Sequence, residues 1–274
     1  MKTKHKIKND IMEIFLWILS LVVLIPFAIV ILGSVKNQAE AGAFSLKLPT
    51  EWMFSNYAQV IEEAHIFRAL FNSLFIASVS VIICVIVSSM GAFILARKRS
   101  KLANILYLFI YMGMAAPTQT IPTIHLMQKL HIYGGYFNVI LLSTVFNIAF
   151  SVFLYTGFFK SIPREIDEAA LIDGASQMTM FFKVIFPIAT PTTMTVATLI
   201  FLGIWNDINV PLYFLNSSSK WTMPMTVYNF FGMHYQSWNL VFANIVLITL
   251  PVFVIYILSQ RFLVSGITNG AVKG

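Results

Sequence analysis

Residues 69–96, which read ALFNSLFIASVSVIICVIVSSMGAFILA, carry no charged side chain between Arg68 and Arg97. A helix needs about 20 consecutive apolar residues to cross the hydrocarbon core of a bilayer, so this stretch is long enough for one spanning helix. In the whole chain 58% of residues are hydrophobic and 11% are charged. Soluble domains carry roughly 25% charged residues. The sequence therefore predicts a protein that folds in lipid.

Five further uncharged stretches predict five more spans. They lie between Glu13 and Lys36, Lys101 and Lys129, Lys129 and Lys160, Lys183 and Asp207, and Lys220 and Arg261. Polar residues interrupt the first half of the last stretch, so we expect its helix near residues 240–260 and an outer loop before it. The chain is thus predicted to be an all-α polytopic membrane protein with six transmembrane helices.

These spans divide the chain into segments. We expect an inner N-terminus at residues 1–12, a first span at 13–35, an outer loop at 36–68, a membrane core at 69–262 and an inner C-terminal tail at 263–274. The lysines before the first span resemble the start of a secretory signal peptide. The apolar run from Ile14 to Val35 exceeds the roughly 7–15 residues of a signal core, which favours a retained helix.

The basic residues predict the orientation in the membrane. With both termini inside, thirteen of the 18 Lys and Arg residues fall in inner segments. Basic residues concentrate in cytoplasmic loops, so both ends are expected in the cytoplasm. The net charge of +7 is spread over every inner loop, and membrane topology therefore explains it better than nucleic-acid binding does.

Several motifs of membrane enzymes are missing from the sequence. No Gly-Lys pair occurs, which excludes a phosphate-binding loop of the P-loop type. There is no His-Glu-x-x-His zinc helix, and the one acid near a span, Asp207, lies at an outer end. Cys84 is the single cysteine and has no disulfide partner in the chain. We predict a chain without catalytic residues or a metal site.

The longest polar stretch on the inner side, residues 161–187, begins SIPREIDEAALIDGAS. We call it the acidic loop. It is predicted to form two short helices: Ser161 caps the first and Gly174 ends it, and Ser176 caps a second that runs to Pro187. Acidic residues in the first turn favour the positive end of the helix dipole.

The acidic loop has two possible roles. Ala169, Ala170 and Gly174 remove bulk from one side of it, and Glu165 and Glu168 offer carboxylates, which suits a surface that enters a groove on another protein. The alternative is a helix that lies on the lipid surface. Helices of that kind are usually rich in Lys and Arg, so docking to a protein is favoured.

The same residues resemble the permease subunits of binding-protein-dependent ABC importers. Glu168-Ala-Ala, then three residues, Gly174, and Pro187 thirteen further on match the family signature E-A-A-x3-G-x9-I-x-L-P, with Val184 and Phe186 in place of its Ile and Leu. Further matches, such as Asn56-Tyr57 and Trp205-Asn206-Asp207, extend over most of the chain. The carbohydrate branch, and its maltose-type second permease subunit, is the closest resemblance, because residues 266–274 look like its terminal G-L-T-x-G-A-V-K-G.

The resemblance implies a methionine-importer-type permease fold in the plasma membrane of a bacterium. It implies that the acidic loop is a coupling helix that fits a cleft of a separate ATPase subunit. The implied coupling residues are Glu165, Glu168, Ala169, Ala170, Asp173, Gly174 and Pro187. The tail residues Gly270, Val272, Lys273 and Gly274 are implied to reach the ATPase interface, whereas composition alone would favour a disordered end.

The family also implies which partners complete the transporter. They are a homologous permease subunit, in a heterodimer, two ATP-binding subunits that hold ATP and magnesium, and an extracytoplasmic solute-binding protein that delivers a sugar. The chain itself would need no cofactor and bind no nucleic acid.

Two spans carry patterns that point to packing or to a path. Small residues recur every four positions in the second span, at Ser80, Cys84, Ser88, Ala92 and Ala96, and allow close helix packing in lipid. In the fifth span Thr195, Thr198 and Asn206 fall within about 80° of one another on a helix. This stripe could line a translocation path or bond to other helices. Asn72 and Asp207 are further candidates for the path.

The third span is predicted to be kinked or broken by Pro117 and Pro122. Its His125 is expected to be a packed residue.

The pattern as a whole predicts an importer that works by alternating access and is driven by a separate ATPase. Glycerol-phosphate or another small polar solute is the alternative cargo. A secondary transporter would want an ionisable residue near the middle of the membrane, and none is evident. A purely structural membrane subunit would give the capped acidic loop no purpose.

Overall fold

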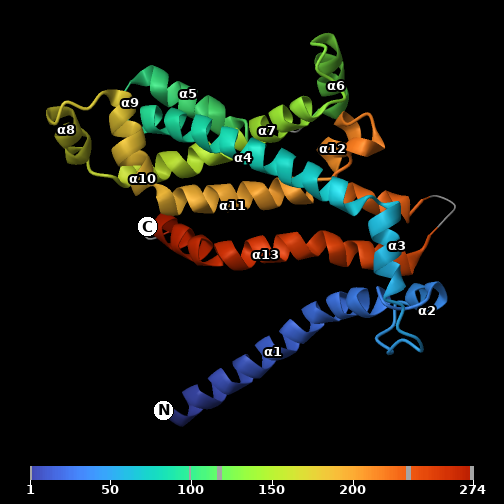
Figure 1. Cartoon of the computed structure of the whole chain (residues 1–274). Helices are drawn as coiled ribbons and strands as arrows, with labels where there is room; N and C mark the ends of the chain where they lie inside the picture. Colours follow the sequence, from blue (N-terminus) through green and yellow to red (C-terminus); the bar gives the residue numbers. More distant parts are fainter. Residues whose placement is uncertain (1, 99, 116–118, 233–235, 272–274) are drawn as a thin grey trace. The chain divides into compact units, whose positions relative to one another are not determined.

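The structure, a computed structural model, describes residues 2–98, 100–115, 119–232 and 236–271. In this part of the chain all the named elements are helices (Figure 1). Two isolated β-bridges occur outside them, between Gly134 and Leu215 and between Phe231 and Gln236. The α-helices are α1 (Lys2–Gly33), α2 (Gln38–Gly42), α3 (Ser55–Glu63), α4 (Ile66–Arg97), α5 (Lys101–Met112), α6 (Thr120–Lys129), α7 (Tyr136–Ser161), α8 (Glu165–Ile172), α9 (Gln177–Met180), α10 (Phe186–Ile188), α11 (Thr190–Asn206), α12 (Asn209–Phe214) and α13 (Trp238–Ala271). A π-helical turn at Phe181–Ile185 and two 3-10 turns, Ser218–Lys220 and Pro224–Asn229, complete the set.

Three helices within the described residues are long and apolar enough to cross a bilayer. They are Ile66–Arg97, Tyr136–Ser161 and Trp238–Gln260. A fourth candidate is the pair Gln177–Ile188 and Thr190–Asn206, which is bent by 77°. The two other predicted spans hold shorter apolar segments, Leu19–Gly33 at the end of α1 and Lys101–Met112, which is α5. All six predicted stretches thus contain apolar helix, and the full length of a span is reached in three of them.

The fifth predicted span departs from a straight helix. Pro187 lies in α10 and Pro191 lies in the first turn of α11. Proline removes a backbone donor and clashes with the preceding turn, so the helix breaks at Ala189 between them. The third predicted span also divides, as expected, into α5 and α6.

The chain separates into two compact units. One comprises residues 1–67 and 226–251, and the other comprises residues 68–225 and 252–274. In the first unit Asn56 is buried and its amide donates to the carbonyls of Ser34 and Lys36, both at 2.9 Å. Asn239 at the start of α13 donates to the Asn56 side-chain oxygen at 3.0 Å. Asn56 therefore joins the end of α1, α3 and the start of α13.

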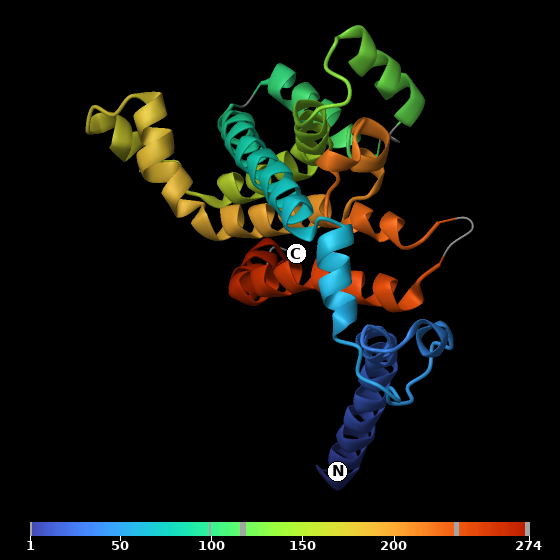
Figure 2. The ribbon, with the colours of Figure 1, turned by 45° about the vertical axis from the view of Figure 1, so that its right-hand side comes forward.

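The second unit is built on α4, α7 and α11, which run side by side (Figures 1 and 2). Its core includes fully buried side chains from all three helices: Ile76, Val139, Tyr155, Phe159, Val196 and Ile200. Ser80, Cys84, Ser88 and Ala92 of α4 have no exposed surface. The Cys84 sulfur lies 3.4 Å from the Ser151 hydroxyl on α7. The small residues thus serve close packing of α4 against α7.

The two ends of this helix stack carry different structures. Helices α8 and α9 lie at one end, and α6 and α12 lie at the other (Figures 1 and 2). At the second end Asn72 is buried and donates to the carbonyls of Ser219 and Trp221, while Tyr136 donates to its side-chain oxygen at 2.9 Å. The first end holds the acidic loop.

Candidate functional site: the acidic loop and its anchors

The acidic loop forms two helical segments joined by a sharp turn. Helix α8 (Glu165–Ile172) is followed by Ser176, whose hydroxyl accepts a hydrogen bond from the Thr179 backbone N–H at 3.2 Å. Ser176 therefore caps the second segment, as predicted. That segment runs through α9 and the π-helical turn into α10. π-Helical turns are rare and occur often at functional sites.

The predicted cap of the first segment is wrong. Ser161 is the last residue of α7, and its hydroxyl donates to the Phe158 carbonyl at 2.7 Å. Arg164 holds the N-cap position of α8 and makes no side-chain capping bond. The backbone N–H of Glu168 bonds to the Arg164 carbonyl. The helix starts later than Ser161 because the Ile162-Pro163 step is extended, with Ile162 at ψ 127°, as is usual before proline.

Gly174 ends α8 in a Schellman turn. Its φ is +80°, in the left-handed region. The N–H of Gly174 bonds to the Leu171 carbonyl and the N–H of Ala175 bonds to the Ala170 carbonyl, both at 3.0 Å. This is the bond pattern of the motif, which favours glycine because a side chain strains the left-handed conformation. The sequence predicted the stop, and the backbone gives its reason.

Arg97, the last residue of α4, anchors the acidic loop to the helix stack. Its Nε lies 2.6 Å from Oδ2 of Asp167, and its Nη2 donates to Oδ1 of Asp167 at 3.0 Å. The Nη1 of Arg97 donates to the carbonyls of Phe159 and Ile162, each at 3.0 Å. One guanidinium therefore satisfies the free carbonyls near the end of α7 and pairs with α8. Both side chains of the ion pair are about 15% exposed.

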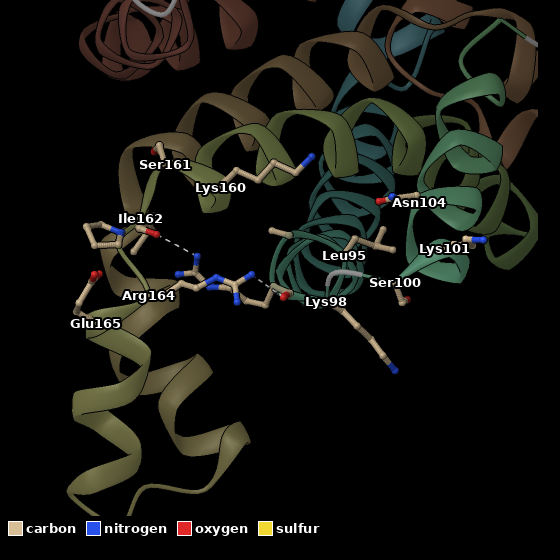
Figure 3. Close-up of a pocket in the computed structure, with 13 residues that line it drawn as sticks. Leu95, Lys98, Ser100, Lys101, Asn104, Lys160, Ser161, Ile162, Arg164 and Glu165 are labelled. Carbon is tan, nitrogen blue, oxygen red and sulfur yellow. Dashed lines mark hydrogen bonds between the residues drawn. The ribbon is translucent and has the colours of Figure 1, made fainter.

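Arg164 makes the reciprocal contact. Its Nη2 donates to the Arg97 carbonyl at 2.9 Å (Figure 3). Neither Arg97 nor Asp167 was singled out from the sequence, because the positive-inside rule already accounted for the arginine and the helix dipole for the aspartate. A signal existed, because an arginine directly after a span and an acid in the first turn of an inner helix are natural partners.

An aromatic cluster packs the acidic loop against the helix stack. Phe93 of α4, Phe159 of α7 and Phe181 of the π-helical turn lie with ring centroids 5.5–6.5 Å apart. Phe159 and Phe181 are buried, and so is Ala170 of α8. Aromatic pairs add roughly 0.5–1.5 kcal/mol beyond the area they bury. The loop is thus fixed to α4 and α7 of the stack.

The outer surface of the acidic loop is partly apolar. Glu165, Glu168, Ala169, Asp173, Gly174 and Pro187 are exposed. Leu171 is 50% exposed, Ile172 is 85% exposed and Met178 is 55% exposed. The sequence predicted the acids and the small residues at this surface, but not the exposure of these three apolar side chains. A rigid element that presents apolar and acidic groups together is suited to a protein partner.

The three candidate path residues of α11 make hydrogen bonds to carbonyls of their own helix. Thr195 and Thr198 are buried and donate to the carbonyls of Pro191 and Met194 at 3.0 and 2.7 Å. Asn206 is exposed and donates to the Leu202 carbonyl. Asp207 accepts from the Asn209 N–H at 2.8 Å, which caps the start of α12. Asn72 lies at the far end of the stack in the network described above, apart from the two threonines.

A small cavity of about 40 Å³ lies beside α6, α7 and α12. Gln119, Thr120, Thr123, Asn209 and Tyr213 give it polar walls. Ligand pockets usually measure roughly 300–1,000 Å³. The cavity therefore has room for water and not for a sugar ring in this conformation.

The tail cannot be placed in full. Val272, Lys273 and Gly274 lie outside the described residues, and Gly270 falls in the last turn of α13.

Comparison with known proteins assigns the chain to a family. Residues 88–269 match the family described as binding-protein-dependent transport system inner membrane component. The chain belongs to this family and is an integral membrane protein of a transport system. The acidic loop lies inside the matched region.

Individual relatives cover nearly the whole chain. A probable starch degradation products transport permease, AmyC of Thermoanaerobacterium thermosulfurigenes, is 36% identical over 93% of this chain and 94% of its own length. The melibiose, raffinose and stachyose import permease MelC of Bacillus subtilis is 31% identical over 91% of both chains. A solved bacterial ABC transporter involved in alginate import matches with a TM-score of 0.82 at 23% identity, over 93% of this chain and 96% of that chain. At this identity the last match supports the fold alone.

Proposed function

We propose that this chain is the membrane-spanning permease subunit of an ATP-driven importer for a sugar. The observation that carries the proposal is the acidic loop: a family signature built as a rigid element, anchored by Arg97 and presenting Glu165, Glu168 and Ile172 outward. Relatives named for starch products and for melibiose, raffinose and stachyose support a sugar as the cargo. A glycan importer has the same fold.

The acidic loop is the coupling element of this proposal. Leu171, Ile172 and Met178 supply apolar anchors for the cleft of an ATPase subunit, and Glu165 and Glu168 supply charge at its rim. The contacts of Arg97 carry the movement of the loop into α4 and α7. The C-terminal tail, including Gly270, Val272, Lys273 and Gly274, reaches the same interface.

The membrane arrangement follows from the same proposal. The six apolar segments cross the plasma membrane of a bacterium in a methionine-importer-type fold, with both termini and the acidic loop in the cytoplasm. The shorter helices α5 and Leu19–Gly33, and the bent pair at Ala189, complete their crossings with neighbouring segments. Broken helices of this kind are common beside transport paths.

Transport proceeds by alternating access. A binding protein delivers the sugar outside, two ATPase subunits close on ATP, and the acidic loop transmits the closure to the spans. The chain has one such loop, so a homologous permease subunit supplies the second. ATP hydrolysis takes place in the ATPase subunits. Thr195, Thr198 and Asn206, with Asn72 and Asp207, are the candidate path residues. The hydroxyl and amide groups of Thr195, Thr198 and Asn206 can exchange an intrahelical bond for one to a sugar hydroxyl.

Uptake by the assembled transporter tests this function. The chain is reconstituted in proteoliposomes with its partner permease, ATPase and binding protein, and radiolabelled maltotriose, raffinose and glycerol phosphate are offered in turn. We expect uptake of a sugar that requires internal ATP and the binding protein and that persists when proton and sodium gradients are collapsed. Gradient-driven uptake by this chain alone would overturn the proposal, and uptake of glycerol phosphate alone would overturn the sugar assignment.

A further inference from the structure

A groove of about 960 Å³ lies between the α4–α5 junction and the α7–α8 junction (Figure 3). Both junctions are at the end of the stack that carries the acidic loop. The groove is lined by basic side chains from two segments that are far apart in the sequence: Arg97, Lys98 and Lys101 from the first, and Lys160 and Arg164 from the second. Glu165 is the one acid among its lining residues. Folding thus gathers charges that the sequence spreads over two loops.

Most of this positive charge has no acidic partner among the residues that the structure describes. Within the described residues the one ion pair is Arg97 with Asp167. Lys98, Lys101 and Arg164 are exposed. Lys160 is also exposed, and its Nζ lies 5.1 Å from the centroid of the Tyr107 ring, a contact that leaves its charge uncompensated. The N-terminus of α5 begins at the groove wall behind its cap, Ser100, and adds the positive end of a helix dipole.

An apolar surface continues from the groove along α5. Leu102, Ile105 and Phe109 are 63%, 62% and 72% exposed, and they share one face of the helix. A ligand with an anionic head and an apolar tail fits this sequence of surfaces. A free phosphate or a small phosphate ester shares the anionic chemistry but would leave the α5 face unused.

We propose that this groove binds the phosphate headgroup of an anionic glycerophospholipid, with an acyl chain along the exposed face of α5. Basic pockets between membrane helices at the cytoplasmic face bind anionic headgroups, and a Lys or Arg near the surface contributes about 1 kcal/mol to such binding. The bound lipid bridges the α4–α5 and α7–α8 junctions, beside the Arg97–Asp167 pair. It stabilises the anchor of the acidic loop. The cytoplasmic placement of this end rests on the proposed function; the binding itself does not.

The test compares two double variants of the full-length chain in nanodiscs. K98Q/K101Q removes two groove charges, and K47Q/K129Q removes two exposed lysines elsewhere, so the net charge of the two proteins is equal. Each protein is placed in pure phosphatidylcholine or in phosphatidylcholine with phosphatidylglycerol. The midpoint of thermal unfolding and the phosphatidylglycerol retained after detergent exchange are measured.

We expect phosphatidylglycerol to raise the unfolding midpoint of the wild type and of K47Q/K129Q. We expect K98Q/K101Q to bind this lipid roughly thirtyfold more weakly, because two lysines at about 1 kcal/mol each are removed, and to retain correspondingly less of it. Equal retention by both variants would overturn the proposal. Millimolar inorganic phosphate added to phosphatidylcholine discs separates the sources: an equal rise in midpoint would show a free-phosphate site and overturn the lipid assignment. Loss of ATPase co-purification in K98Q/K101Q with lipid retention intact would show a protein interface and also overturn it. Lipid retention and the unfolding midpoint are measured without sugar transport. Failure of the lipid proposal therefore does not imply failure of the proposed transport function, or the reverse.

Discussion

Arg97 and Asp167 form a two-pronged ion pair that joins the end of α4 to the first turns of α8. Because Arg97 also donates to the Phe159 and Ile162 carbonyls, the same side chain fixes the end of α7. The acidic loop is therefore held to the helix stack by a side chain as well as by its backbone connections. An element fixed in this way can transmit a displacement to the helices, whereas a flexible loop would move without moving them.

This geometry predicts unequal effects for the two partners. Asp167→Asn removes the charge of the ion pair but leaves the two carbonyl contacts of Arg97 in place, and it should cost about 1–2 kcal/mol. Arg97→Gln leaves an acid and two carbonyls without their donor and should cost about 3 kcal/mol or more. We expect transport per assembled complex to fall more in Arg97→Gln than in Asp167→Asn, measured by ATP-dependent uptake beside thermal unfolding.

Arg68→Gln, at the opposite end of the same helix, is the matched control because its side chain is exposed. It should change neither quantity. An effect of Asp167→Asn as large as that of Arg97→Gln would show that the carbonyl contacts of Arg97 carry no weight.

Much of the fold could be read from the sequence because apolar length and charge placement act locally. The gap between Arg68 and Arg97 became α4, and Gly174 and Ser176 ended and capped helices as expected. The family was also identified correctly from the Glu168–Pro187 signature. These features depend on the properties of single segments.

The features that sequence reading missed depend on contacts between segments. The local sequence does not show that Asp167 faces the helix stack while Glu165 and Glu168 face outward, since all three lie in the first turn of α8. Ser161 could have capped a helix, but Pro163 keeps the chain extended and α7 retains the serine. Register against other helices decides such cases, and it is absent from a single sequence.

The Schellman turn makes a prediction about Gly174. Apart from the two adjacent residues, no described atom lies within 4 Å of the position that a β-carbon would occupy at Gly174, so crowding within the chain is not an obstacle. The cost of Gly174→Ala comes from φ alone and should be about 1–2 kcal/mol. Asparagine tolerates this conformation better, so Gly174→Asn should retain more ATP-dependent uptake than Gly174→Ala.

Gly91→Ala in α4 is the matched control, because a β-carbon there also meets no atom and the glycine is helical. It should be neutral or slightly stabilising in thermal unfolding. If Gly174→Asn reduced uptake more than Gly174→Ala, limited space against a partner protein, and not backbone conformation, would explain why glycine is required at this position.

Ile172 should matter to assembly and not to the stability of the chain. It is 85% exposed, so Ile172→Ser loses little packing within the subunit. If the acidic loop enters an ATPase cleft, this change should weaken association roughly tenfold or more, as truncation of an interface anchor does. Co-purification of the ATPase and the unfolding temperature of the chain are measured together. Leu130→Ser, 55% exposed on the far side of the stack, should leave co-purification intact. A drop in unfolding temperature without loss of the ATPase would contradict the interface.

Cys84 tests the packing of α4 against α7. Its side chain is fully buried and its sulfur lies 3.4 Å from the Ser151 hydroxyl, in a row of small residues that lets the helices approach. Cys84→Ser keeps the side-chain volume nearly unchanged and should change the free energy of unfolding by less than about 1 kcal/mol. Cys84→Leu places extra atoms in the packed contact between α4 and α7 and should cost about 1–3 kcal/mol, because the helices must separate or the side chain must leave its preferred rotamer. Thermal unfolding of the full chain in nanodiscs measures both changes, with Ile82→Leu as the control because Ile82 is 57% exposed on the same helix. Equal stability of Cys84→Leu and Cys84→Ser would mean that α4 and α7 do not pack closely at this level.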